Sequence, residues 1–260
     1  MLVSERRERI LAHVSERGTV TIPELAQILS VSPMTIRRDI DLLAEEGGVR
    51  KVRGGVRAPS KTPAPRAPAA AVSPERRAVA ALAAGLVEPG MAVGISGGAI
   101  SLALAEELAG IPELTIVTNS LPVSDLFARP DRADEPYTQT VVLTGGVRTP
   151  AQAMVGPVAV RALEQLHCDI VFLDVHGLDV QAGMTTMNLL EAETDRAFMA
   201  AGREVVVLAD HGRWGVVGLT TVADLDDIDR LVVDAGLADD ARAQLAAHVG
   251  ELLVADPRES

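Results

Sequence analysis

The sequence predicts two domains: a small, mainly helical N-terminal domain with a short β wing, and an α/β domain with a largely parallel sheet. Three observations predict this organisation. Two helix-start signals follow each other closely within residues 1–57. A Pro- and Ala-rich stretch without apolar periodicity, residues 58–72, is typical of a linker. Short apolar runs then alternate with helical stretches over residues 73–260, which favours a parallel sheet covered by helices.

Local patterns predict three helices in the N-terminal domain, and start signals mark two of them. A helical pattern over Glu5–Arg17 comes first. The second helix starts at Thr21, because Thr21 can cap the first turn while Glu24 reaches back to the N–H of Thr21. The third starts at Ser32-Pro33, where Ser is a favoured cap and Pro needs no N–H partner. The turn between the last two helices is three or four residues long, the spacing of a helix-turn-helix.

The third helix has one apolar face and one polar, basic face. Ile36, Ile40 and Leu43 recur at helical spacing and should face inward. The basic face lies near the N-terminal end, which meets base edges and phosphates when such a helix enters a major groove. A short strand, Val49–Arg53, and a Gly54-Gly55 turn then indicate a basic wing. We therefore expect DNA contacts from Ser32, Met34, Thr35, Arg37, Arg38, Arg50, Lys51 and Arg53.

Charge is divided unevenly along the chain. Residues 1–70 carry 12 Lys and Arg against 8 Asp and Glu, a net charge of +4, whereas residues 71–260 carry 12 against 28, a net charge of −16. Because an acidic surface repels phosphate, DNA contact should be confined to the N-terminal domain and should weaken as salt rises. One small helix-turn-helix makes few contacts, so we expect a homo-oligomer, a dimer or tetramer, on a double-stranded DNA operator.

Composition excludes several classes of protein. No apolar run is long enough for a transmembrane helix, and the charges of residues 5–9 exclude a signal-peptide core, so we expect a cytoplasmic protein without a membrane partner. The single cysteine, Cys168, allows neither an internal disulfide nor a Cys-based zinc site, and its apolar surroundings favour a buried, inert thiol. Dinucleotide, nucleotide-phosphate and metalloprotease motifs are absent from the sequence, so we expect no cofactor and no metal.

The second domain reads as alternating helices and strands. Ser73-Pro74 repeats the cap-plus-proline signal and opens an Ala-rich helix that continues to about Val87. The strands are expected at Met91–Ile95, Leu114–Thr118, Thr140–Thr144, Ile170–Asp174, Glu204–Ala209 and Leu231–Asp234. Further helices are expected near Ser101–Ala109, Leu121–Ala128, Val158–Leu166 and Leu189–Ala201.

Most of the notable polar and glycine residues follow directly on a predicted strand. Open parallel sheets collect ligands at the carboxyl ends of their strands, against helix N-termini. Glycines there let backbone N–H groups approach an anion, hydroxyl and amide groups can bind sugar oxygens, and arginines can bind phosphate. We therefore expect one pocket to gather Ser96, Gly97, Gly98, Asn119, Ser120, Gly145, Gly146, Arg148, Thr185, Thr186, Glu191, Asp210 and Arg213.

Over nearly its whole length the chain resembles the DeoR family of transcriptional regulators. The stretch Glu5–Gly55 is similar to the family's winged helix-turn-helix, including the run TIRRD at Thr35–Asp39. The runs VTNS, LTGG, VGP, GMTT and ADH, with Asn188 and the Glu191-Ala192 pair, resemble its sugar-phosphate-sensing domain. The resemblance implies an oligomeric repressor of carbohydrate-metabolism genes that leaves DNA when a phosphorylated sugar or related metabolite binds the second domain.

Several departures from the family pattern fall in the expected pocket. The family's Asp-Ala-Gly-Thr-Thr-Thr run is replaced by Ser96–Ser101, which loses the carboxylate and two hydroxyls. Asp195 and Ile170 stand where lysine is usual, and Asp174 and His176 occupy positions that are usually small or neutral. Arg213-Trp214 takes the place of Lys-Phe, and both lysines of the chain, Lys51 and Lys61, precede the second domain. Extra carboxylates would disfavour a dianionic phosphate unless arginines compensate.

Two alternatives stay open at the level of the sequence. A DNA-binding regulator with a degenerate or reassigned sensor would bind DNA indifferently to sugar phosphates. A sugar-phosphate isomerase-like enzyme would share the fold that the second domain resembles, with Asp174, Glu191 or Asp210 as a base. The absence of lysine and the attached DNA-binding domain argue against the enzyme, so we expect no catalysis and no catalytic residues.

Overall fold

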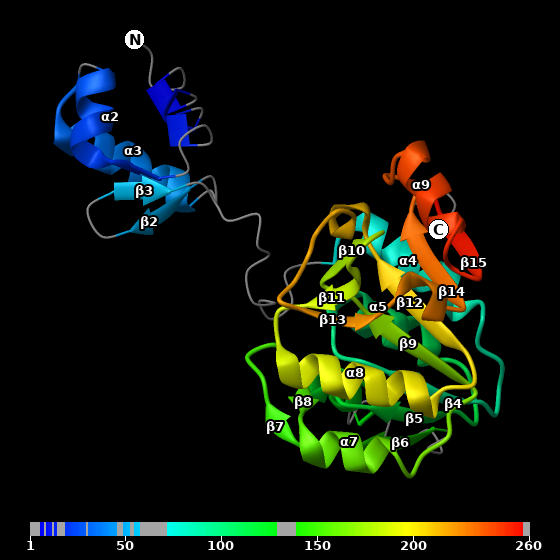
Figure 1. The fold of residues 1–260 in the computed structure, drawn as a ribbon. Coiled ribbons are helices and arrows are strands. Elements are labelled where there is room, and N and C mark those ends of the chain that lie inside the picture. The colour runs from blue at the N-terminus through cyan, green and yellow to red at the C-terminus, as the bar shows by residue number, and fades with distance from the viewer. Residues whose placement is uncertain are drawn as a thin grey trace. The chain divides into compact units, whose positions relative to one another are not determined.

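The computed structural model divides the chain into two compact units, Met1–Ala64 and Pro65–Ser260 (Figure 1). Each unit is described by itself. The structure describes residues 6–7, 9–11, 13–14, 19–29, 31–45, 49–52, 55–57, 72–128 and 139–256. The expected linker at residues 58–72 therefore lies almost entirely outside the described residues; Val72, which is described, packs against the core of the second unit.

The first unit contains helices and a three-stranded antiparallel sheet in the order β1-β3-β2. Helical residues among 6–14 agree with the expected first helix. Ile36, Ile40 and Leu43 are all buried, as their spacing predicts, and pack with Ile10 and Leu25. The other elements are β1 (Thr19–Thr21), α2 (Ile22–Ile28), α3 (Pro33–Glu45), β2 (Arg50–Val52) and β3 (Gly55–Arg57).

The predicted start signals of α2 and α3 are confirmed. The Thr21 N–H donates to the Glu24 carboxylate over 2.8 Å, and the Glu24 N–H donates to the Thr21 hydroxyl over 3.4 Å, which is a complete capping box. Ser32 Oγ accepts the N–H of Thr35 over 3.2 Å at the start of α3. The strand β1 at residues 19–21 was not predicted. One local assignment needs correction: Gly55, assigned to a turn, begins β3, because it pairs with Thr21 and with Val52.

The second unit is built on a parallel sheet of seven strands in the order β15-β14-β12-β9-β4-β5-β6. Six of these strands lie where the sequence predicts them, and β15 was not predicted. Their bounds are β4 (Ala92–Ile95), β5 (Thr115–Thr118), β6 (Thr140–Leu143), β9 (Ile170–Asp174), β12 (Val205–Ala209), β14 (Arg230–Asp234) and β15 (Glu251–Ala255).

Helices cover both faces of this sheet. Apolar side chains of α4, α5 and α6 share one core cluster with Ile95 and Phe172, whereas those of α7, α8 and α9 share the opposite cluster with Val171 and Val207. In Figure 1, α8 crosses in front of the sheet. The helices are α4 (Pro74–Ala84), α5 (Ala99–Leu108), α6 (Leu121–Phe127), α7 (Pro157–Leu163), α8 (Leu189–Ala201) and α9 (Asp239–Ala246).

Smaller elements extend the carboxyl edge of the sheet. None of them was predicted, because each strand has only two to four residues and no clear alternation. They are the hairpin β7 (Val147–Arg148) and β8 (Met154–Val155), the antiparallel sheet of β10 (Gly177–Asp179), β11 (Gly183–Thr186) and β13 (Thr220–Ala223), and two 3-10 turns, η2 (His211–Arg213) and η3 (Leu225–Asp227). Within the described part of the chain, no helix is long and apolar enough to cross a membrane.

The order of the strands reverses between β4 and β9. Along the chain, β5 and β6 are added on one side of β4, whereas β9, β12, β14 and β15 follow on the other side. At such a switch point the connections leave toward opposite faces, and a crevice opens outside the carboxyl ends of the two central strands. A ligand is therefore expected to bind at the carboxyl ends of β4 and β9.

Candidate functional site

The polar face of α3 is exposed. Ser32, Arg37 and Arg38 are exposed, Thr35 is half-buried, and Met34 keeps 71% of its surface accessible. Neither arginine forms a hydrogen bond or an ion pair with another residue that the structure describes. Two cations next to an apolar side chain on the N-terminal half of a helix can enter a DNA groove without first breaking an internal contact.

A neighbouring ion pair fixes this helix to the first one. Asp39, which is only 3% exposed, accepts Arg6 Nε over 2.6 Å and Arg6 Nη2 over 3.3 Å, and Arg7 Nε lies 3.5 Å away. Contact with the Asp39 carboxylate raises the pKa of the Arg6 guanidinium. Asp39 thus has a structural role at the end of the TIRRD run, where it holds Arg6 and Arg7 of the first helix.

The expected wing is partly described. Arg50 and Lys51 lie in β2, which pairs antiparallel with β3 so that Lys51 faces Val56. Arg53 lies outside the described residues. The backbone therefore agrees with a two-stranded wing beside α3, and Val49 and Val56 bury its base against the helices.

In the second unit, the β4–α5 loop and the end of β5 come together. The position of a Cβ on Gly97 would lie 2.8 Å from the Ala153 Cβ and 3.8 Å from the Asn119 Oδ1, so Gly97 is closely packed. Asn119 Nδ2 donates to the Met154 carbonyl over 3.1 Å, and the Asn119 carbonyl accepts the Met154 N–H over 2.7 Å. Asn119 thereby attaches β8 to the sheet edge. Ser120 is the N-cap of α6 and accepts the Val123 N–H.

Asp174, at the end of β9, reaches across to the same loop. Its Oδ2 accepts the N–H of Ile100 in the first turn of α5 over 3.0 Å, and its own N–H donates to Ser96 Oγ over 3.1 Å. Asp174 is 7% exposed and Ser96 is 2% exposed. Any side chain at Gly98 would collide with this carboxylate, because a Cβ there would lie 2.0 Å from Oδ2. The predicted residues 96–98 therefore surround a buried acid.

Asp210 and Arg213 lie together at the end of β12. Arg213 Nε is 3.7 Å from Asp210 Oδ2, and Arg213 Nη1 lies 3.5 Å from the carbonyl of His176. Asp210 Oδ2 also accepts Arg76 Nε over 2.7 Å, which connects the end of β12 to the first turn of α4. Asp210 and Arg213, both expected at this site, are thus neighbours, and Arg76 binds the same carboxylate of Asp210.

A histidine–aspartate pair stands beside them. Asp234, fully buried, accepts the His211 N–H over 2.6 Å and lies 2.8 Å from His211 Nδ1, while half of the imidazole is exposed. The side-chain hydrogen bond to Asp234 raises the pKa of His211. Burial favours a higher pKa for Asp234, but hydrogen bonds from His211 and Gly236 outweigh it, so the pKa of Asp234 is lowered.

The remaining predicted residues form hydrogen bonds or turns in the neighbouring strands and loops. Thr185 lies inside β11, accepts the Gly218 N–H over 2.9 Å and is 3.3 Å from the Gly177 carbonyl. Thr186 donates to Glu191 over 3.0 Å. Arg148 in β7 is exposed and donates to Gln152 over 3.1 Å. Gly145 and Gly146 follow β6 with positive φ angles of 72° and 126°. A Cβ at Gly146 would lie 2.7 Å from the Val155 carbonyl, so this turn requires glycine.

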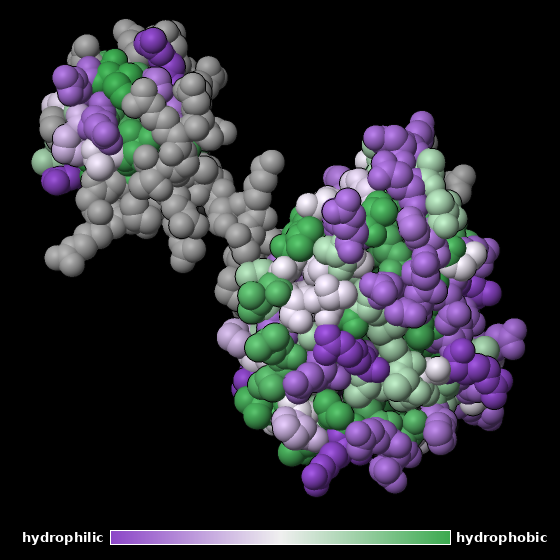
Figure 2. Space-filling view, viewed as in Figure 1, coloured by the Kyte–Doolittle hydropathy of each residue, from purple (hydrophilic) through white to green (hydrophobic). Residues whose placement is uncertain are grey.

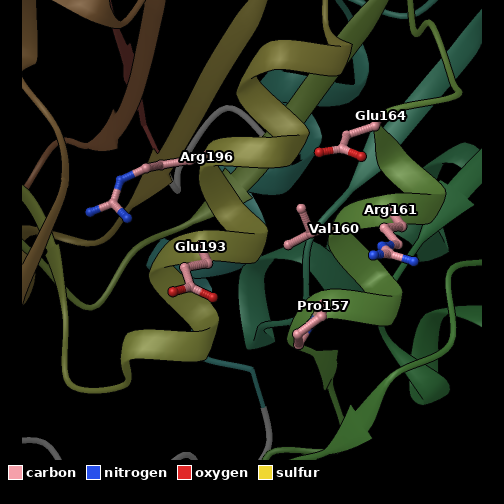
Figure 3. A pocket seen from close by; sticks show the side chains of 6 residues that line it. All are labelled: Pro157, Val160, Arg161, Glu164, Glu193 and Arg196. Atoms are coloured by element: carbon pink, nitrogen blue, oxygen red, sulfur yellow. The ribbon is translucent and has the colours of Figure 1, made fainter.

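An open groove in the second unit is lined by none of these residues. It has a volume of about 550 Å³ and runs between α7 and α8 (Figure 3). Its lining residues are Pro157, Val160, Arg161, Glu164, Glu193 and Arg196. The Arg196 guanidinium points away from the groove in Figure 3 and donates to the carbonyls of Thr221 and Val222. Two acids beside the remaining arginine make this groove a poor match for an anion, and we assign the candidate site to the strand ends.

Sequence patterns do not predict two contributions to the candidate site, and they predict a third only in part. Arg76 was read only as part of an Ala-rich helix, and its partner Asp210 is 134 positions away. His211 was noted in a polar run, but its pairing with Asp234 has no local signal. Asp174 was recognised as an unusual acid, and its placement against α5 follows from the pairing of β4 with β9.

Comparisons with known proteins agree on one family. The family model described as the DeoR-like helix-turn-helix domain matches residues 6–62, and the model of the DeoR C terminal sensor domain matches residues 72–235. An uncharacterized HTH-type transcriptional regulator of Escherichia coli, YgbI, is 32% identical over 98% of this chain and 99% of its own. A putative aga operon transcriptional repressor of Escherichia coli O157:H7 is 27% identical over 97% of this chain and 94% of its own.

Solved structures give a weaker likeness. A ribose 5-phosphate isomerase from Methanocaldococcus jannaschii is 16% identical over 54% of this chain and 53% of its own, with a TM-score of 0.38. A likeness of this size carries no argument for enzymatic activity. The whole-length relatives are instead named as transcriptional regulators, in agreement with the expectation that the chain is not an enzyme.

Proposed function

Because the chain belongs to the DeoR family of transcriptional regulators, we propose that it represses carbohydrate-metabolism genes and leaves its operator when a metabolite binds the second unit. The observation that supports DNA recognition most directly is the exposed basic face of α3, with Arg37 and Arg38 held outward. Ser32, Met34 and Thr35 on the same helix end, and Arg50, Lys51 and Arg53 of the wing, complete the proposed DNA contacts.

We propose that the effector is a phosphorylated sugar or a related metabolite, bound at the carboxyl edge of the sheet. The support is the placement of polar groups at the ends of β4, β5, β9 and β12, where parallel sheets bind ligands. Asn119 and the turn at Gly145-Gly146 offer groups for hydroxyls, and Arg148 and Arg213 offer positive charge.

Repression and release can be tested with the full-length protein. The experiment measures binding to its own promoter fragment by fluorescence anisotropy, with and without a panel of sugars and sugar phosphates. We expect tight binding without metabolite and a loss of about tenfold or more with the effector, which corresponds to a coupling free energy of about 1.4 kcal/mol or more. A metabolite that increases DNA affinity would contradict release.

A second candidate is a regulator whose sensor is degenerate or reassigned. Hydroxyls that could bind a sugar phosphate are already used inside the protein: Thr185 holds the segment at Gly218, and Thr186 holds Glu191. This reading predicts the same DNA affinity with every metabolite of the panel. It also predicts that the same compounds leave the thermal stability of the second unit unchanged.

We propose a homo-oligomer, a dimer or tetramer, formed by a second copy of this chain. Exposed apolar side chains support it, and their segments, including β7 and the first turns of α7 and α8, lie along one side of the second unit (Figures 1 and 2). The Arg161, Glu164 and Glu193 side chains beside this face carry both charge signs, as a self-complementary contact requires. We call the exposed apolar side chains of these segments and their adjoining loops the apolar face: Val147, Val158, Met187, Leu189, Val217 and Leu219.

A further inference from the structure

The first turn of α5 is where a phosphate would be expected to bind. This helix starts immediately after β4, at the switch point between β4 and β9. Its N-cap, Gly98, has no side chain to accept the free amides of the first turn. A helix N-terminus of this kind, at the carboxyl edge of a parallel sheet, binds anions in many proteins.

In this chain a carboxylate already occupies that position. Asp174 Oδ2 accepts the Ile100 N–H over 3.0 Å, the kind of bond that a phosphate oxygen would make. The aspartate cannot easily leave, because its N–H is held by Ser96 Oγ and its side chain packs against Gly98. A phosphate at the same amides would stand next to a buried negative charge, which repels it strongly.

A second buried group beside the loop also favours a ligand that donates a hydrogen bond. Asn119 is 2% exposed, and its Oδ1 has no hydrogen-bond partner among the residues that the structure describes. Because Nδ2 donates to the Met154 carbonyl, the amide orientation is fixed and Oδ1 remains an acceptor close to Gly97. A buried acceptor without a partner is costly, so this atom is suited to a ligand that donates a hydrogen bond.

We propose that the end of the effector site at the β4–α5 loop binds an uncharged, hydroxyl-bearing group, and that Asp174 excludes phosphate from it. The ligand class is a carbohydrate or polyol whose hydroxyls donate to Asp174 and to Asn119 Oδ1. This inference deepens the proposed function and rests on it. Asp174 is then the residue that determines specificity at this end of the site.

The test compares phosphorylated and unphosphorylated partners on three full-length proteins: wild type, Asp174→Asn and Asp169→Asn. The probes are ribose and ribose 5-phosphate, glucose and glucose 6-phosphate, mannitol and mannitol 1-phosphate, and inorganic phosphate. Asp169→Asn is the matched control, because Asp169 Oδ2 also accepts a backbone N–H, that of Ala92, but at the opposite end of β9. Binding is measured by thermal shift and by calorimetry.

We expect Asp174→Asn to gain affinity for at least one phosphorylated probe or for inorganic phosphate by about tenfold or more, while Asp169→Asn behaves as the wild type. Asn can still accept the Ile100 N–H, and Asp174→Ser serves as a second variant if the first does not fold. The proposal is overturned if phosphorylated probes bind the wild type and Asp174→Asn equally well. It is also overturned if no phosphorylated probe binds either folded variant.

A failure of the proposal for Asp174 can be distinguished from a failure of the proposed function. Thermal shift and calorimetry report binding of the metabolite in the absence of DNA, whereas operator release is measured by anisotropy on promoter DNA. A metabolite that binds but does not change DNA affinity contradicts release and leaves the role of Asp174 intact. A sugar phosphate that releases DNA with unchanged affinity in Asp174→Asn contradicts the role of Asp174 and supports the proposed function.

Discussion

Individual charged side chains in this protein serve two different purposes. Asp39 and Arg6 hold helices together, whereas Arg37 and Arg38, on the same helix as Asp39, face outward. Asp234 is buried and holds His211, whose imidazole is half exposed. Partners inside the protein therefore distinguish Asp39 and Arg6, which belong to the framework, from Arg37 and Arg38, which are available to DNA.

Replacement of either outward arginine should weaken operator binding. We expect Arg37→Ala or Arg38→Ala to lose about 1–3 kcal/mol of binding free energy if the side chain reads a base edge. A phosphate contact would instead weaken all DNA sequences alike and reduce the slope of log affinity against log salt by about 1. Anisotropy titrations at several salt concentrations distinguish the two. Arg203→Ala, an exposed arginine of the second unit, is the control. Unchanged binding in both Arg37→Ala and Arg38→Ala would contradict the DNA face.

The His211–Asp234 pair should make stability depend on pH. The folded-state pKa of His211 is raised above its ordinary value of 6.5, so the stability that it contributes is complete below pH 6.5 and is lost as the pH rises through the folded-state pKa. The difference in Tm between wild type and His211→Gln should therefore shrink as the pH rises from about 5.5 to about 9. A difference that stays constant over this range would mean that packing, not charge, carries the contribution.

Helix starts are the elements on which the site geometry depends. Asn188 caps α8 by accepting the N–H groups of Leu190 over 2.9 Å and of Glu191 over 3.4 Å. Glu191 in turn accepts the Thr186 hydroxyl, so this cap also orders β11. Side-chain caps of this kind compensate for the missing intrahelical partners of the first turn.

Loss of this cap should destabilise the second unit. We expect Asn188→Ala to lower the free energy of unfolding by about 1 kcal/mol, whereas Asn188→Asp, which keeps an accepting oxygen, should lose less. Urea denaturation followed by circular dichroism measures both. Equal losses in the two variants would indicate that the cap bonds contribute little and that packing of the side chain dominates.

Local patterns predicted the elements well, and contacts between distant residues could not be predicted in the same way. The capping box at Thr21 and Glu24 and the stripe of Ile36, Ile40 and Leu43 depend on neighbours within one helix, so the sequence contains them directly. The bond from Ile100 to Asp174 joins positions 74 residues apart. The pairing of β4 with β9 brings these two residues together, and no local sequence pattern indicates which strands pair. Short strands such as β7 and β8 were missed because two residues show no periodicity.

Across the whole molecule, charge and apolar surface are segregated. Positive charge is concentrated in residues 1–70, and the second unit is strongly acidic. Exposed apolar side chains gather on one side of that second unit. Such an arrangement suits a protein in which one unit contacts DNA and the other contacts a second copy.

Charge placed on the apolar face should weaken self-association. We expect the double variant Leu189→Glu and Leu219→Glu, with parent side chains that are 60% and 68% exposed, to reduce the molar mass in solution toward that of a single 27.3 kDa chain. Leu82→Glu, at a 37% exposed position on α4, is the matched control. Light scattering after size-exclusion chromatography measures the mass. An oligomer that persists in the double variant would place the contact on another face.

Cys168 has a practical consequence for labelling. Its thiol is buried, and burial raises its pKa to about 11, so the thiol is almost entirely in its unreactive, protonated form at neutral pH. A maleimide dye should therefore react with a cysteine introduced at Met34, which is 71% exposed on α3, while the native thiol stays unmodified. One substitution would thus put a fluorophore on the helix face that we propose contacts the operator, without a cysteine-free background.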